Sequence, residues 1–123
     1  MDDRNHVINY KGKDILYVNH NGLEGNKIIE NMKNAVKKTE ELAKNGNEIL
    51  AIYDFTDVYV TEEVMNYLKS DETKNVMKYI KKSAVIGIVG IKKIFLNVFN
   101  AVTSANTKAF DKLDEAKEWL VKN

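Results

Sequence analysis

The sequence contains no cysteine and no proline, and each absence excludes a class of structure. Without cysteine there can be no disulfide, no thiolate metal site and no cysteine nucleophile. Because residues 1–13 also lack the pattern of a secretory signal, we expect a cytoplasmic setting. Without proline or a tract rich in glycine and serine, nothing marks a linker between domains. We therefore expect residues 1–123 to form a single domain.

The chain also has little net charge and no long hydrophobic run. Its formal charge is +1 at pH 7, whereas domains that bind nucleic acid are usually clearly basic, so we expect no nucleic-acid partner. The longest apolar stretches, such as Ala84 to Val89, are far shorter than the roughly 20 residues that cross a bilayer. We therefore expect no transmembrane segment.

Charge is nevertheless segregated along the chain. Residues 40–72 carry nine acids and two lysines, whereas residues 73–110 carry seven lysines and no acid. One half of the chain could therefore present a cationic face to a partner. The alternative is that these lysines lie apart on separate helices, since neighbours in sequence need not be neighbours in space.

Reactive side chains are few. His6 and His20 lie near opposite ends of the N-terminal region, without a third nitrogen or sulfur ligand for zinc, and we interpret both as incidental. None of the serines, Ser70, Ser83 and Ser104, lies in a Gly-x-Ser-x-Gly elbow. We therefore expect no enzymatic activity, no metal and no cofactor.

Hydrophobic periodicity predicts the elements of the first half. Short β-type runs at 7–10 and 14–19 flank a glycine and indicate a hairpin. Apolar positions at helical spacing between 28 and 43 predict a helix that stops at Asn45-Gly46, and the continuous apolar run within 48–55 predicts a buried strand. Thr61 is expected to cap a further helix, and residues 70–73 are expected to break it in two, although one long helix is the alternative.

The second half predicts a buried strand at 84–89, a helix at 91–103, a short strand at 107–110 and a final helix capped by Asp111. Strands that alternate with helices are typical of a largely parallel sheet. We therefore predict an α/β fold with about five strands, an N-terminal antiparallel hairpin and four to five helices.

Two segments support a resemblance to a known family. The run AVIGIVGIKK at 84–93 and the ending FDKLDEAKEWL at 110–120, together with the hairpin start, resemble the SpoIIAA-like family of STAS-type domains. This resemblance covers nearly the whole chain. It implies a right-handed β/α superhelix with consecutive strands side by side and the crossover helices on one face.

The resemblance also implies two kinds of function. Related STAS proteins are anti-sigma antagonists, switched by phosphorylation of a serine at a helix start, and the SpoIIAA-like branch resembles lipid-carrying Sec14-type domains. In the comparable place this chain has DFTDVYVTEE at 54–63, which lacks the Asp-Ser-Ser-Gly pattern of the switch. A phosphate on Thr61 would be attracted by the helix start but repelled by Glu62 and Glu63.

Candidate ligand residues follow the two buried strands, since open α/β sheets bind ligands beyond the carboxyl ends of their strands. Asp54, Thr56 and Asp57 could bind a cation or a polar ligand, or could satisfy turn and helix-start amides instead.

A second set of candidates, Gly87, Gly90, Lys92 and Lys93, could cradle an anion at a helix start. The alternative is that Gly87 allows close packing and Gly90 makes a turn. The spacing is neither that of a phosphate loop nor that of a dinucleotide fingerprint.

The predicted helix at 91–103 has an apolar arc of roughly 220°, which is wider than a single core stripe needs. Packing on the sheet leaves Leu96 and Phe99 to contact a neighbouring helix, a second subunit, an apolar ligand or a membrane surface. We therefore expect a non-enzymatic interaction or regulatory module of STAS type, which binds a protein partner or itself as a possible homodimer. The alternative is a carrier or sensor of a small anionic or lipid-like ligand.

Overall fold

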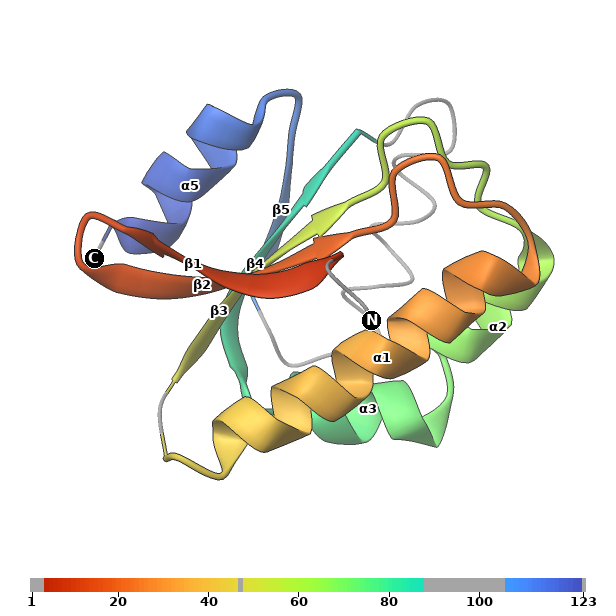
Figure 1. Cartoon of the computed structure of the whole chain (residues 1–123), viewed down its shortest axis with the longest axis horizontal. Coiled ribbons are helices and arrows are strands. Elements are labelled where there is room, and N and C mark those ends of the chain that lie inside the picture. Colours follow the sequence, from red (N-terminus) through yellow and green to blue (C-terminus); the bar gives the residue numbers. More distant parts are fainter. Residues whose placement is uncertain (1–3, 47, 88–105, 123) are drawn as a thin grey trace.

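A computed structural model of the chain describes residues 4–46, 48–87 and 106–122. After an initial hairpin, α1 separates β2 from β3, and two helices, α2 and α3, separate β3 from β4 (Figure 1). In chain order they are β1 (Asn5–Tyr10), β2 (Lys13–Asn19), α1 (Asn26–Ala43), β3 (Ile49–Asp54), α2 (Glu62–Leu68), α3 (Asp71–Met77), β4 (Ile80–Ile86), β5 (Asn106–Phe110) and α5 (Leu113–Val121).

The five strands form one sheet in the order β1-β2-β3-β4-β5. β1 pairs with β2 in antiparallel fashion, and every other neighbouring pair is parallel. This confirms the predicted α/β class, the N-terminal hairpin and the largely parallel five-stranded sheet. Four helices lie within the described ranges, in agreement with the predicted four to five.

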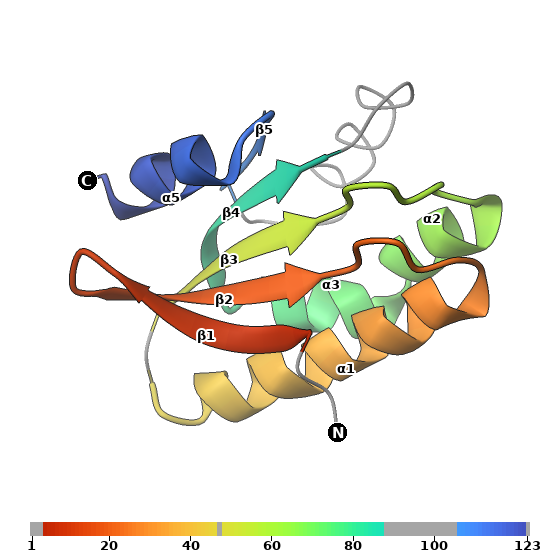
Figure 2. The same cartoon turned by 45° about the horizontal axis from the view of Figure 1, so that its top comes forward.

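Helices cover both faces of the sheet. α1, α2 and α3 pack on one face, and α5 lies on the other (Figures 1 and 2). The continuous apolar run of β3 requires a cover on its second face as well as its first. α5 supplies that cover through Ala116 and Leu120, which are 0% and 1% exposed.

Alternation along each strand produces two cores. Leu16, Ala51 and Val85 face α1, α2 and α3. Ile52 points to the opposite side of the sheet and faces α5. Because side chains on a strand point alternately to opposite faces, an uninterrupted apolar run is what a strand covered on both sides requires. β3 is accordingly buried at five of its six positions.

The caps explain where the short helices begin. The Thr61 hydroxyl accepts a hydrogen bond from the Val64 amide, and the Ser70 hydroxyl accepts one from the Thr73 amide. The predicted break between two helices is therefore confirmed, with Ser70 as the residue that starts the second.

Three expectations for the second half differ from the structure or lie outside it. β4 begins at Ile80, four residues before the predicted start. The prediction missed this part of the strand because polar residues occupy its amino-terminal half. α5 has Lys112 at its N-cap instead of Asp111. The helix predicted at 91–103 lies outside the described residues. Within the described part of the chain, no helix is long and apolar enough to span a membrane.

Candidate functional site

The carboxyl ends of β2, β3 and β4 meet at one edge of the sheet, where their arrowheads point the same way (Figure 2). Asp54 ends β3 there and is 7% exposed. Its Oδ1 accepts hydrogen bonds from the Thr56 amide at 2.9 Å and the Thr56 hydroxyl at 2.6 Å. Its Oδ2 accepts one from the Tyr17 hydroxyl at 2.5 Å. Three donors therefore orient this carboxylate, which fills the turn-forming role that the sequence offered as an alternative.

Gly87, the one described residue of the second predicted set, lies against the first set. It has a φ of +81°, and a Cβ there would lie 2.5 Å from Thr56 Cα and closer still to the Thr56 nitrogen and hydroxyl. The Phe55 amide donates to the Ile86 carbonyl at 2.8 Å in the same place. The chain after β3 thus lies directly against the end of β4, and only glycine leaves room for that approach.

The remaining predicted ligand residues do not join this contact. Asp57 is exposed and has a φ of +57°, a conformation that aspartate tolerates better than most residues. Gly90, Lys92, Lys93, Leu96 and Phe99 lie outside the described residues.

His20, which sequence reasoning treated as incidental, is buried beside this edge at 1% exposure. Its backbone amide donates to the Asp54 carbonyl at 2.9 Å, and its ring packs on Phe55 with 4.7 Å between centroids. Asn31 Nδ2 donates to the ring Nδ1 at 2.9 Å, which requires that nitrogen to be unprotonated. Burial lowers the pKa of His20 to about 4, so the ring is neutral at pH 7.

The residues around His20 complete a buried polar network. Asn5 Nδ2 donates to Asn31 Oδ1 at 3.0 Å, and Asn31 Nδ2 also donates to the Asn19 carbonyl at 3.0 Å. These contacts join β1, the end of β2 and α1. The sequence signal that could have found His20 is its position directly after a strand, but its partner Asn31 is eleven residues away on a helix.

The loop at 55–61, here called the β3–α2 loop, projects from this edge. Phe55 and Val60 are buried at its two ends, whereas Tyr59 between them is 81% exposed. Burial of both ends and the contact with Gly87 fix the base of the loop. An exposed aromatic ring on a fixed loop can enter a pocket of a partner at little entropic cost.

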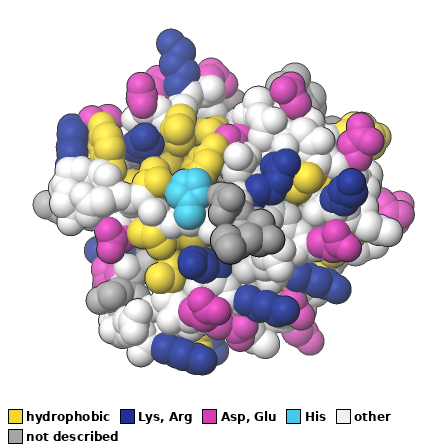
Figure 3. Space-filling model, viewed as in Figure 1, with side chains coloured by type: hydrophobic (Ala, Val, Ile, Leu, Met, Phe, Trp, Pro, Cys, Tyr) yellow, Lys and Arg dark blue, Asp and Glu magenta, His cyan; other side chains and the backbone are white. Residues whose placement is uncertain are grey.

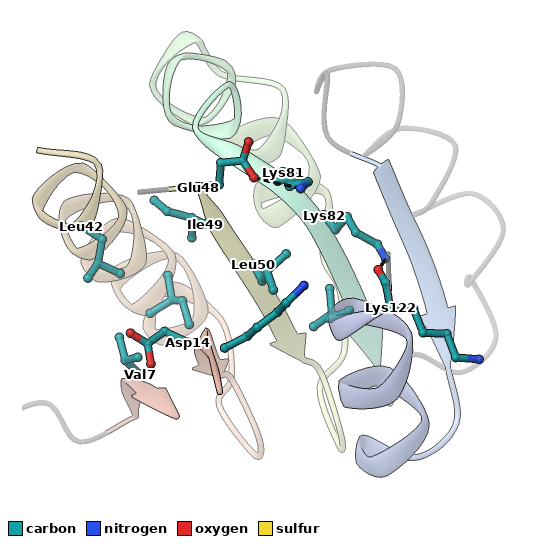
Figure 4. Close-up of a pocket in the computed structure, with 12 residues that line it drawn as sticks. Val7, Asp14, Leu42, Glu48, Ile49, Leu50, Lys81, Lys82 and Lys122 are labelled. Atoms are coloured by element: carbon teal, nitrogen blue, oxygen red, sulfur yellow. Dashed lines mark hydrogen bonds and ion pairs between the residues drawn. The ribbon is translucent and has the colours of Figure 1, made fainter. Parts of the chain in front are cut away.

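The opposite edge of the sheet holds a cavity of about 810 Å³, here called the amino-edge pocket (Figure 4). It lies where β2, β3 and β4 begin, between the last turns of α1 and α5. The described residues that line it are of two kinds, apolar and charged. They are Val7, Lys13, Asp14, Leu16, Leu42, Glu48, Ile49, Leu50, Lys81, Lys82, Leu120 and Lys122.

Metal ligands do not gather at either edge within the described ranges, where no group of three histidine or acidic side chains could hold an ion. A search of family models, curated proteins and solved structures finds no match to this chain.

Proposed function

We propose that this chain is a non-enzymatic interaction module of STAS type that binds a protein partner or a second copy of itself through the β3–α2 loop. Tyr59 carries the proposal, because its ring is 81% exposed on a loop whose two ends are buried. Large aromatic residues of this kind often contribute the most binding energy in a protein interface. A cytoplasmic setting belongs to the same proposal.

The element order supports the SpoIIAA-like assignment within this proposal. Consecutive strands lie side by side from β1 to β5, as the resemblance implies. A right-handed superhelix of this family is the finer fold that we propose. The resemblance implies that the helices which connect consecutive strands share one face of the sheet. α5 follows the last strand and lies on the opposite face, so that expectation does not cover it.

The carboxyl-edge contacts support a non-enzymatic role. The oxygens of Asp54 accept hydrogen bonds from Tyr17 and Thr56, which orient the carboxylate within the fold instead of toward a substrate. His20 is buried and accepts from Asn31. Thr61 caps α2 with its hydroxyl, so the proposal includes no phosphorylation switch at this residue.

Site-specific crosslinking tests the proposed surface. We expect p-benzoyl-phenylalanine in place of Tyr59 to give a defined crosslinked product in cells, either with a second copy or with another protein. The matched control carries the same group in place of Tyr79, which is 43% exposed and lies beside the other edge of the sheet. The same products from both positions would indicate random collisions and would argue against the loop.

A purified partner allows a quantitative test. We expect Tyr59→Ala to weaken its binding by about tenfold or more, as truncation of a central aromatic residue typically does, whereas Tyr79→Ala leaves the affinity unchanged. If the partner is a second copy, the change appears as a lower dimer fraction in sedimentation analysis. Equal affinities for the Tyr59→Ala protein and the original chain would refute the role of the loop.

A second candidate function is a carrier or sensor of a small anionic or lipid-like ligand. The amino-edge pocket favours it, because a cavity of about 810 Å³ falls within the range of small-molecule sites. Native mass spectrometry of the freshly purified protein should then show a bound mass, and a protein without any adduct that also ignores added acyl anions would exclude the carrier.

A further inference from the structure

The floor of the amino-edge pocket is apolar on both sides of β3. Leu16 and Ile49 belong to the core under α1, whereas Leu50 and Leu120 belong to the core under α5. All four are at most 8% exposed, so the cavity ends on the packed interior of the protein. A ligand that extended into the cavity would therefore contact hydrocarbon side chains. The hydrophobic effect favours a ligand whose buried part is apolar.

A β-bulge places two consecutive lysines at this pocket. The pairing of β3 with β4 shifts register between Ile49 and Leu50, which pair with Ile80 and Lys82. Lys81 is thereby left without a partner residue on β3. Successive residues of a regular strand point to opposite faces, but a bulge redirects a side chain, and both Lys81 and Lys82 line the pocket.

Lys82 is held in place by the end of α5. Its Nζ donates to the Trp119 carbonyl at 2.7 Å and to the Lys122 carbonyl at 3.2 Å, and lies 4.3 Å from the centre of the Trp119 ring. Burial lowers the pKa of Lys82, and so does the positive charge of Lys13, Lys81 and Lys122 nearby. Lysines that repel one another in this way favour a bound anion.

The two carboxylates of the lining have partners of their own. Glu48 forms an ion pair with Lys81 at 2.9 Å, and Asp14 accepts a hydrogen bond from Asn9 at 3.0 Å. Figure 4 shows Glu48 beside Lys81 at one rim and Asp14 beside Val7 at another. The lining has four lysines against these two acids, so its charge is positive.

We propose that the amino-edge pocket binds a medium-chain acyl carboxylate, with the carboxylate at Lys13, Lys81 and Lys82 and the hydrocarbon chain on the leucine-rich floor. This inference rests on the second candidate function, the carrier, and gives it a site and a ligand class. The residues that carry this inference are not the candidates that the sequence suggested, which included Lys92 and Lys93. Charge complementarity selects the carboxylate, and burial of methylene groups selects the chain.

Calorimetric titration with octanoate, decanoate and dodecanoate below their micellar concentrations tests this proposal directly. We expect affinity to rise about threefold to fourfold for each methylene added, and acetate to show no binding. Trp119 is the only tryptophan of the chain and lies against Lys82, so its emission should change as the site fills. A neutral amide of decanoate should bind more weakly than decanoate.

Two double variants locate the site. Lys13→Gln with Lys81→Gln removes two lysines of the lining, and Lys37→Gln with Lys74→Gln removes two exposed lysines that do not line it. Both change net charge by the same amount, so a general electrostatic effect is shared. We expect the first pair to weaken decanoate binding by about tenfold or more and the second to leave it within twofold. Circular dichroism checks that both variants fold.

The results separate the site from the function. Equal decanoate affinity for both double variants would overturn the amino-edge pocket while leaving a carrier with a site elsewhere. Failure of the original chain to bind any of the three acids would overturn the pocket as an acyl-carboxylate site. The same failure in a protein that also shows no adduct in native mass spectrometry would exclude the carrier as well, and would leave the proposed protein-binding loop untouched. Binding that is lost only in the first variant supports the proposal.

Discussion

Gly87 is the residue whose replacement the structure restricts most clearly. Its φ is +81°, and a Cβ would overlap the Thr56 backbone. We expect Gly87→Ala to lower the free energy of unfolding by about 2 to 4 kcal/mol, because a left-handed conformation and a steric clash both add to the cost. Urea denaturation followed by circular dichroism measures this loss.

Gly22 provides the matched control for Gly87. It also has a positive φ, +73°, but no atom lies within 4 Å of the position that a Cβ would take there. Gly22→Ala should therefore cost only the conformational part, about 1 to 2 kcal/mol. If both variants lose the same stability, the close approach of Gly87 to Thr56 is not what holds the carboxyl edge together.

His20 makes the stability of the fold depend on pH. Its pKa falls from 6.5 to about 4 on folding because the ring is buried. Because the folded-state pKa lies below the unfolded-state pKa, the unfolded chain takes up the proton at a higher pH than the folded chain does. The stabilisation is therefore complete above pH 6.5 and is lost as pH falls toward 4, which corresponds to about 2 kcal/mol between pH 7.5 and 5.

Comparison with His20→Gln isolates this contribution, since loss of stability from protonated carboxylates is common to both proteins. We expect the original chain to lose about 2 kcal/mol more than His20→Gln between pH 7.5 and 5 in urea denaturation. His6→Gln, which alters an exposed ring, should behave like the original chain. An identical pH dependence for His20→Gln would show that His20 is not buried as a neutral ring.

At the residue scale, sequence reasoning identified some contacts and missed others for a physical reason. Asp54 and Thr56 could be placed in a turn, because their hydrogen bonds span only two residues. The contact of Gly87 with Thr56 joins two strand ends, and glycine at a strand end indicated it. The burial of His20 depends on Asn31 from α1, which no local pattern specifies.

At the element scale, α2 and α3 depend on their first residues. Each has seven residues, which is too short for a helix to be stable without caps and packing. We expect Thr61→Ala to lower the free energy of unfolding by about 1 kcal/mol, because the Val64 amide loses its acceptor. Thr61→Ser keeps a hydroxyl and should retain most of that stability in thermal unfolding, and an equal loss in both variants would contradict the capping role.

The same caps made the starts of α2 and α3 predictable from the sequence. The start of β4 was not predictable in this way. Ser70 and Thr61 signal helix starts through their own hydrogen-bonding groups. Lys81, Lys82 and Ser83 are polar, and a predicted strand requires alternating or continuous apolar residues. They form a strand because β3 and β5 pair beside them, and the bulge at Lys81 and the amino-edge pocket follow from that pairing.

At the scale of the whole molecule, the charge segregated along the sequence is not segregated on the surface that Figure 3 shows. Basic and acidic side chains intersperse on that face, and hydrophobic side chains gather beside a histidine near the middle of it. Among the described lysines of residues 73–110, Lys74 lies on α3, Lys81 on β4 and Lys108 on β5, so they are spread over different elements. On the face that Figure 3 shows, the described residues therefore do not form a uniform cationic surface.

The sheet has a core on each face, so the two cores should unfold together. Leu120 on α5 is 1% exposed and packs on the face opposite α1. We expect Leu120→Ala to lower the free energy of unfolding by about 2 to 5 kcal/mol through the cavity that it leaves, and Leu68→Ala, in the other core, to cost a similar amount.

Trp119 fluorescence reports on the α5 face, while far-ultraviolet circular dichroism reports on all helices and strands. Because β2, β3 and β4 contribute side chains to both cores, the two signals should change at the same urea concentration in the original chain and in both leucine variants. A fluorescence transition at lower urea than the circular dichroism transition would mean that α5 detaches alone. The second core would then be a separately folding cover instead of part of one cooperative unit.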